Sequence, residues 1–308
     1  MNQAAFDCLC VALNPAIDHS LSIPHFAAGK VNRVAAEESR PAGKGVNVGV
    51  AVARAGFRVA VSGFLGEDNA GSFESLFRKY AVVDECVRIA GATRTGIKIT
   101  DPANQTTTDI NFPGAEPTAD DVAGLRERIA NLDARWAVLA GSLPPGVPVS
   151  IYAELTADLM RRGTRVAVDT SDRPLQFAIA AKPSVIKPNI HELEAITGRS
   201  LKTRADVLKT ARELVQGGIE CVIVSMGAEG ALFVTAAEAL LAVPPQLLIR
   251  TTVGAGDAMV AGWIAASLRG LPLEKAARLA TAFSLAAIDV SPRDEPRSYF
   301  PCIQITQP

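Results

Sequence analysis

Short apolar stretches, each followed by a longer amphipathic one, constrain the fold of this chain more than any other feature. The apolar stretches lack polar alternation, which is typical of strands buried on both faces of a parallel sheet. They are CLCVAL (8–13), FRVAVSGF (57–64), WAVLAG (136–141), RVAVD (165–169), SVIKP (184–188) and CVIVS (221–225). The segments between them, such as 149–163 and 204–218, have apolar residues three or four apart and end on glycine, as helices do. The alternation predicts an α/β fold with a mostly parallel central sheet flanked by helices.

Two segments interrupt this pattern. Residues 16–41 and 91–113 lack helical periodicity and contain strand-like runs such as TGIKIT and TTTDINF. Ordinary surface loops are the alternative, but structureless loops of about 20 residues are uncommon in compact domains. We therefore expect one domain over 1–308, with lid segments at about 14–41 and 91–113 that form a small β-sheet lid.

Composition excludes several function classes. The 308 residues include 31 basic and 32 acidic ones, a net charge of −1, so no general field attracts nucleic acid or an anionic membrane surface. No signal peptide is evident, and no apolar run approaches the roughly 18 residues of a membrane span. Five scattered cysteines suit buried thiols in a reducing compartment; a metal site at Cys8 and Cys10 is disfavoured because no other Cys or His cluster lies near. A soluble, cytoplasmic protein is expected.

A glycine-rich turn precedes an apolar helical pattern in TTVGAGDAMVAG (251–262). Gly254 and Gly256 flank Ala255, so a ligand can approach this backbone without Cβ interference. If a helix begins near Asp257, its first N–H groups and the positive end of its dipole form an anion site there. Taken alone, the motif favours the alternative, a glycine turn in which Asp257 only caps the helix.

Further motifs occur at strand ends or helix starts, where open α/β sheets bind their ligands. They are PAGKGVN (41–47), KPNIHELE (187–194) and SMGAEG (225–230). Together with the 251–262 motif they resemble the ribokinase-like carbohydrate kinases of the PfkB family, along nearly the whole chain. LNPAID (13–18), GKVNRV (29–34), TRTGIKI (93–99) and AGSLPPG (140–146) are most similar to the branch that acts on phosphorylated ketohexoses.

The resemblance implies catalytic roles for the glycine turn and its carboxylate. Asp257 would take the proton from the sugar hydroxyl, and Gly254, Ala255 and Gly256 would stabilise charge on the transferred phosphoryl group. Independently, phosphoryl transfer depends mainly on positioning and electrostatics, which such a turn supplies.

The resemblance also implies that ATP and Mg²⁺ are cofactors. Ser225, Gly227, Gly230 and Gly256 would contact the nucleotide, Lys187 would reach a phosphate, and Ser284 would lie on the adenine side. Asn189 and Glu192, three apart in a first helical turn, would hold Mg²⁺, which prefers oxygen donors and few protein ligands. The alternative for Glu192 is a purely structural role, in which its negative charge stabilises the first turn of the helix.

Relatives activated by a monovalent cation have an aspartate where this chain has Thr252. A K⁺ requirement is therefore not expected from the resemblance.

On the sugar side, the resemblance assigns Asp18 and Ser142 to hydroxyl groups and Gly43, Lys44 and Asn47 to the substrate loop. Lys44 and Arg94 would bind a sugar phosphate, since a unit charge pair at 4 Å is worth roughly 4 kcal/mol at an effective dielectric of 20 before desolvation. The guanidinium fork suits phosphate. The alternative for Asp18 is that it is an ordinary turn residue near Pro15 with no role in substrate binding.

The expected reaction is transfer of the ATP γ-phosphate to O6 of fructose 1-phosphate, giving fructose 1,6-bisphosphate. Kinases for tagatose 6-phosphate or fructose 6-phosphate remain alternatives within the family. A kinase for an unphosphorylated sugar or nucleoside is disfavoured by Lys44 and Arg94, and a non-catalytic nucleotide-binding regulator by Asp257. The expected partner is a small phosphosugar, with no nucleic acid or membrane, and the lid strands could form a homodimer.

Overall fold

A ten-stranded sheet organises the computed structural model, which describes residues 5–246, 253–289 and 295–308. The strand order is β14-β13-β12-β11-β10-β9-β8-β1-β4-β5. The strands are β1 (Phe6–Ala12), β4 (Val59–Gly66), β5 (Val83–Ile89), β8 (Ala134–Ala140), β9 (Arg165–Asp169), β10 (Val185–Ile186), β11 (Cys221–Ser225), β12 (Ala231–Thr235), β13 (Ala239–Val243) and β14 (Gln304–Thr306). Pairing is parallel from β5 to β11 and antiparallel from β11 to β14.

The six predicted apolar runs all form strands of this sheet, which confirms the α/β prediction. Four further strands were not predicted: β5, β12, β13 and β14. β5 and β14, at the two edges of the sheet, are only partly buried and lack a continuous apolar run, whereas β12 and β13 are buried and apolar.

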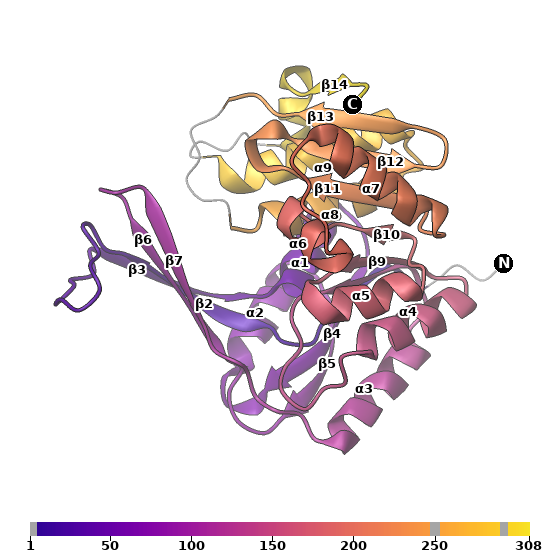
Figure 1. Cartoon of the computed structure of the whole chain (residues 1–308). Helices are drawn as coiled ribbons and strands as arrows, with labels where there is room; N and C mark the ends of the chain where they lie inside the picture. The colour runs from indigo at the N-terminus through magenta and orange to yellow at the C-terminus, as the bar shows by residue number, and fades with distance from the viewer. Residues whose placement is uncertain (1–4, 247–252, 290–294) are drawn as a thin grey trace.

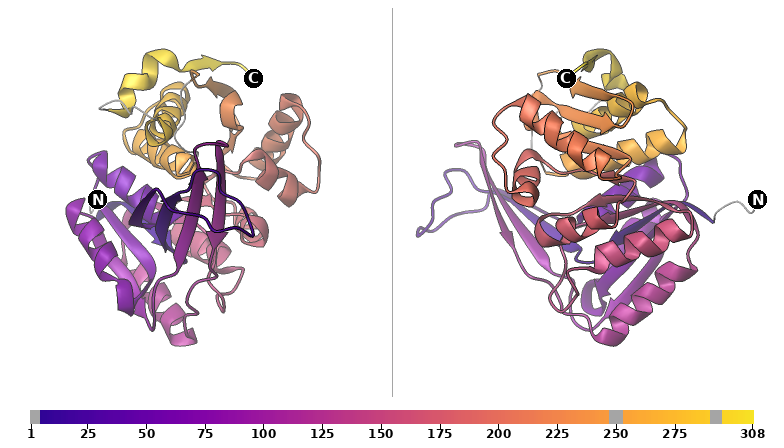
Figure 2. Two further views of the ribbon diagram at one scale, coloured as in Figure 1. Left: turned by 90° about the vertical axis from the view of Figure 1, so that its left-hand side faces the viewer. Right: turned by 45° about the vertical axis from the view of Figure 1, so that its right-hand side comes forward.

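Helices cover both faces of the sheet (Figures 1 and 2). Their bounds are α1 (Lys44–Arg54), α2 (Gly71–Lys79), α3 (Ala119–Asn131), α4 (Ile151–Arg161), α5 (Asp172–Ala180), α6 (Ile190–Thr197), α7 (Arg204–Gln216), α8 (Ala255–Leu268) and α9 (Leu273–Ile288), with 3₁₀ turns η1 (Glu67–Asn69), η2 (Gly227–Glu229) and η3 (Pro296–Cys302). Alternate strand residues face opposite sides: Cys8 and Cys10 pack in the core with α8 and α9, whereas Leu9 and Val11 pack in the core with α3 to α7.

The two segments that lack helical periodicity form a second sheet, which projects from the main body (Figure 1). Its strands are β2 (Ala16–Ser22), β3 (Ala36–Ala42), β6 (Thr95–Asp101) and β7 (Thr106–Asn111), in the order β3-β2-β6-β7. The parallel pairing of β2 with β6 joins the two segments, and Asp18 is opposite Gly96 in that register. The predicted small sheet is therefore present.

Helix α8 lies between α1 and α9 and is buried along most of its length. It is apolar all round, as expected for a helix packed on several sides. At Gly262 the backbone of α9 approaches so closely that a Cβ there would lie 2.7 Å from Cα of Ala280. The glycine therefore sets the distance between the two helices.

Among the described residues, no helix is long and apolar enough to cross a membrane.

Four of the cysteines are buried free thiols: Cys8, Cys10, Cys86 and Cys221.

Replacing Gly262 with alanine should destabilise the protein by about 1–3 kcal/mol, because the extra methyl group overpacks the α8–α9 contact. Chemical denaturation measures the change in the free energy of unfolding. Gly124→Ala in α3 is the matched control: its Cβ would meet no atom within 4 Å, so helix propensity alone should stabilise the protein by about 0.5–1 kcal/mol. An unchanged unfolding free energy for Gly262→Ala would contradict the close-packing argument.

Candidate active site

The first turn of α8 forms the centre of the site. The helix begins at Ala255, two residues before the predicted start at Asp257, and Gly254 caps it with a φ of 82° in the left-handed region that glycine tolerates. Asp257 is therefore in the first turn, only 7% exposed. The first amides of a helix have no intrahelical partner, so they and the helix dipole favour negative charge at this position.

The first turn of α1 orients that carboxylate. Nδ2 of Asn47 donates a hydrogen bond of 2.7 Å to Oδ2 of Asp257. Asn47 is in the first turn of α1, which Gly43 caps with a φ of 120°. A Cβ on Gly43 would lie 2.8 Å from Cα of Pro15, so the tight entry to this helix requires glycine.

A second buried carboxylate, Asp169 at the end of β9, organises the cations of the site. Its Oδ1 lies 3.1 Å from Nζ of Lys44 and 3.4 Å from Nζ of Lys187. Asp169 is 1% exposed, and among the described residues its Oδ2 has no hydrogen-bond partner. Asp169 was not among the residues predicted from the sequence. Its position at the end of the apolar run RVAVD was the one signal in the sequence that could have indicated it.

Lys187 also approaches the glycine turn. A Cβ on Gly256 would lie 3.1 Å from Nζ of Lys187, so this ammonium group is next to the start of α8. A buried cation and a helix N-terminus therefore lie together, and both attract an anion.

The titration of these groups follows from their burial and mutual charges. Burial, and then the charge of Asp169, raises the pKa of Asp257, against the lowering effects of Asn47, Lys44 and Lys187. For Asp169 burial opposes ionisation, but the charges of Lys187 and Lys44 outweigh it and hold the pKa below its usual value. For Lys44 burial opposes the charge, while Asp169, Asp257 and Glu192 raise the pKa. Lys44 therefore remains charged, and Asp257 is a stronger base than an exposed aspartate.

The predicted nucleotide residues meet at neighbouring strand ends. The amide of Ser225 donates to the carbonyl of Pro188 at 3.1 Å, which places Ser225 directly beside Asn189. Gly227 begins η2 with a φ of 60° and faces open space. At position 230 packing alone requires glycine, since a Cβ there would lie 2.0 Å from the carbonyl oxygen of Ala242. Ser284 is a buried residue of α9.

Asn189 and Glu192 form a reciprocal cap at the start of α6. Oδ1 of Asn189 accepts from the amide of Glu192, and Oε2 of Glu192 accepts from the amide of Asn189, both at 2.8 Å. Within the described part of the chain, no three Asp, Glu, His or Cys side chains gather as a ready-made metal site. The donors therefore fit only an ion that keeps most of its waters, as Mg²⁺ does.

The sugar-side candidates lie where the lid joins the core. Arg94 donates to the carbonyl of Asn14 from Nε at 3.3 Å and to that of Phe112 from Nη1 at 3.1 Å. Part of its guanidinium group is therefore already hydrogen-bonded to backbone carbonyls. Nδ2 of Asn14 also donates to Oγ of Ser142 at 3.3 Å. Asp18 is on β2, with Nζ of Lys98 3.9 Å from its Oδ2.

Two cations near Asp18, Lys98 and Arg40, were not predicted from the sequence. Burial raises the pKa of Asp18, while the charges of Lys98, Arg40 and Arg94 act to lower it. Lys98 and Arg40, together with Val253, line a pocket of about 380 Å³ beneath the lid.

Thr252, the position at which relatives activated by a monovalent cation have an aspartate, lies outside the described residues, as does Thr251.

Comparison with known proteins identifies the family of the chain. The family model "pfkB family carbohydrate kinase" matches residues 8–292. The 1-phosphofructokinase of Rhodobacter capsulatus is 48% identical over 281 residues, covering 90% of this chain and 89% of that protein. The 1-phosphofructokinase of Escherichia coli K12 is 36% identical over 287 residues, with 91% and 90% covered.

Solved structures agree as well. Phosphofructokinase-2 from Escherichia coli, in complex with substrates and products, superposes with a TM-score of 0.89 at 29% identity, covering 96% of this chain and 98% of that one. With residues 8–292 matched by the family model and such relatives along 90% of its length, the chain belongs to the pfkB family of carbohydrate kinases.

Proposed function

We propose that this protein is a 1-phosphofructokinase, which transfers the γ-phosphate of ATP to O6 of fructose 1-phosphate. The observation that carries the proposal is the buried Asp257 held by Asn47 in the first turn of α8, beside the ammonium group of Lys187. The 1-phosphofructokinases at 36–48% identity support the choice of acceptor.

In this reaction Asp257 accepts the proton of the O6 hydroxyl as the oxygen attacks phosphorus. Its hydrogen bond from Asn47 fixes one oxygen, which leaves the other to face the acceptor. The free amides at Gly254 to Gly256 and the ammonium of Lys187 stabilise the charge that spreads over the phosphoryl oxygens. Nucleophile activation and charge stabilisation are thus both supplied at the start of one helix.

Mg²⁺ would neutralise part of the phosphate charge when it is bound. Asn189 and Glu192 would hold the hydrated ion through water, because each already uses one oxygen to cap α6. Ser225 and Gly227 flank the same strand ends and would border the nucleotide.

Lys44 and Arg94 are the proposed contacts of the substrate phosphate. Each has N–H donors beyond those in its present bonds, since an ammonium group has three donors and a guanidinium group five. Arg40 and Lys98 on the lid add positive charge near Asp18, the proposed hydroxyl acceptor. Closure of the lid sheet over the substrate would exclude water and protect ATP from hydrolysis.

A homodimer through the lid is also proposed. Ile110 and Phe112, at the end of edge strand β7, are 45% and 49% exposed, and an exposed strand edge with apolar side chains favours pairing with a second copy. Four buried thiols fit the reducing conditions of the cytoplasm, which is the proposed location.

The test of the acceptor is ADP release by the purified protein with ATP and Mg²⁺. We expect kcat/KM to be highest for fructose 1-phosphate among fructose 1-phosphate, fructose 6-phosphate, tagatose 6-phosphate, fructose and ribose. A preference for either 6-phosphate would replace the proposal with that alternative kinase. Turnover of ribose or fructose above the phosphosugars would contradict the roles of Lys44 and Arg94.

Asp257→Asn should lower kcat by at least about 10²-fold, because the amide cannot accept the proton. The dissociation constant for ATP should change little, and isothermal titration calorimetry measures it. Asp158→Asn is the matched control, since Asp158 is an exposed residue of α4 paired with Arg161. A turnover near that of the control would remove the base assignment.

The acid limb of kcat/KM against pH should lie above the ordinary titration of an aspartate, because burial and Asp169 raise the pKa of Asp257 and the base must be ionised. Asp169→Asn should shift this limb to lower pH. The substitution removes a repelling charge and leaves Lys44 and Lys187 free to stabilise ionised Asp257. A shift to higher pH, or none, would show that Asp169 does not act on Asp257 through its charge.

A further inference from the structure

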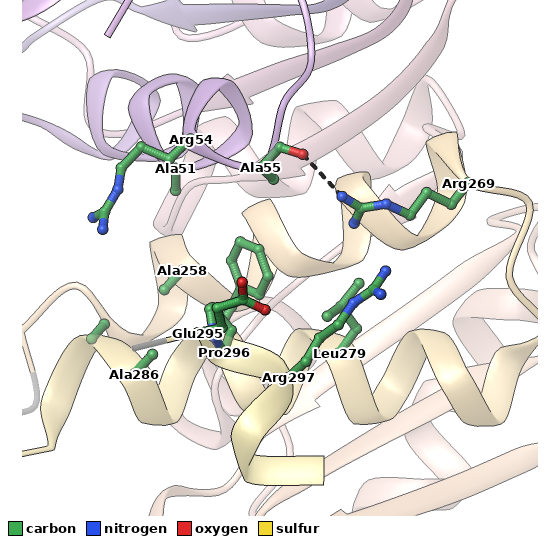
Figure 3. Close-up of a pocket in the computed structure, with 12 residues that line it drawn as sticks. Ala51, Arg54, Ala55, Ala258, Arg269, Leu279, Ala286, Glu295, Pro296 and Arg297 are labelled. Atoms are coloured by element: carbon green, nitrogen blue, oxygen red, sulfur yellow. Dashed lines mark hydrogen bonds between the residues drawn. The ribbon is translucent and has the colours of Figure 1, made fainter. Parts of the chain in front are cut away.

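A groove lies against α8, and Ala258 of that helix is one of its lining residues (Figure 3). Its walls come from α1, α8, α9 and η3, and it encloses about 650 Å³, within the range of roughly 300–1,000 Å³ for small-molecule pockets. Its lining includes none of Lys44, Asn47, Asp169, Lys187 or Asp257. The groove is therefore separate from the site described above.

Three arginines from three different elements line this groove. Arg54 is in the last turn of α1, Arg269 follows the end of α8, and Arg297 is in η3 (Figure 3). Among the lining residues that the structure describes, Glu295 is the one acidic residue, which leaves an excess of positive charge in this part of the groove. Because the chain as a whole is nearly neutral, this local excess is a feature of the groove.

The charges of Arg269 and Arg297 act on each other across the groove. Burial, and then the charge of Arg297, lowers the pKa of Arg269. Arg269 donates one hydrogen bond, of 2.9 Å, to the carbonyl of Ala55, which fixes its guanidinium group and leaves further N–H donors. An anion between the two arginines would relieve their repulsion and accept those donors.

The floor of the groove is apolar. Leu279 and Phe283 of α9 form it together with alanines, among them Ala258 of α8. A simple inorganic ion would leave this surface uncovered, whereas a ligand with a ring or carbon skeleton would cover it. The lining therefore matches a molecule with a doubly charged head and an apolar body.

We propose that this groove is a second binding site, for a small organic phosphate whose phosphate contacts Arg269 and Arg297 and whose carbon skeleton covers Phe283. The inference does not depend on the reaction proposed for the active site. Ala258 directly follows Asp257 in the chain, and its amide donates to the carbonyl of Gly254 at 2.9 Å. An occupant of the groove would thus touch the turn of α8 that positions the proposed base.

The test is a ¹⁹F NMR titration of the intact protein with 4-fluorophenyl phosphate. The double variant Arg54→Ala/Arg297→Ala should weaken binding at least about tenfold, because it removes the charge-assisted hydrogen bonds of Arg297 and the positive charge of Arg54 from the groove. The control Arg173→Ala removes an exposed arginine that stacks on Phe177 outside the groove, and should retain affinity within about twofold. Lys187→Ala should also retain it, which separates this groove from the active site.

The proposal would be overturned by no binding to the wild-type protein, by equal binding to the double variant, or by loss of binding in Lys187→Ala. Neutral 4-fluorophenol should bind far more weakly than the phosphate; equal affinity would exclude a role for the arginines. If the double variant fails to fold by circular dichroism, the single variant Arg297→Gln serves in its place. Displacement by AMP or by phosphoenolpyruvate distinguishes a nucleotide from a small aliphatic phosphate, and displacement by neither would overturn the assignment.

Discussion

The burial of two carboxylates at one end of the central sheet is the constraint on which the site depends. Asp169 and Asp257 lie in the protein interior, where an uncompensated charge is costly, and each raises the cost of the other. Lys44 and Lys187 neutralise Asp169, while Asn47 and the start of α8 stabilise Asp257. The negative charge of Asp257 is only partly compensated, so its pKa is raised. A raised pKa is the property that the proposed role of Asp257 as general base requires.

Sheet topology explains why these groups meet. Asp169 ends β9, Lys187 follows β10 and Ser225 ends β11, and these three strands are adjacent and parallel, so their carboxyl ends lie along one edge. Helices α1 and α6 begin at the same edge and bring Lys44 and Asn189 to it. The lid pairs β2 with β6 and so holds Asp18 beside Arg94, in a sheet that projects next to this edge (Figure 1). The nucleotide candidates thus lie along the central sheet, whereas the sugar candidates are divided between the central sheet, with Lys44, and the small sheet, with Asp18.

Helix α8 connects the two sites of this molecule. Its first turn contains Asp257, its middle packs against α9 at Gly262, and Ala258 faces the arginine-lined groove. A helix packed on nearly every side transmits displacement, because its neighbours have little free volume in which to adjust. This arrangement gives a physical reason why a ligand in the groove would affect the proposed base, and why the tight α8–α9 contact matters beyond stability.

By itself, the sequence determined the parallel core, the small sheet and the start of α8, since continuous apolar runs, strand-like alternation and a glycine turn are local signals. It also selected Asp257, Lys44, Asn47 and Lys187, through motifs that resemble a family. Only the tertiary structure decided that Asp169 pairs with both lysines, that Gly230 is needed for packing, and that three arginines from distant segments share one groove. These features arise between residues far apart in the chain, so their charges and contacts exist only after the strands and helices have packed.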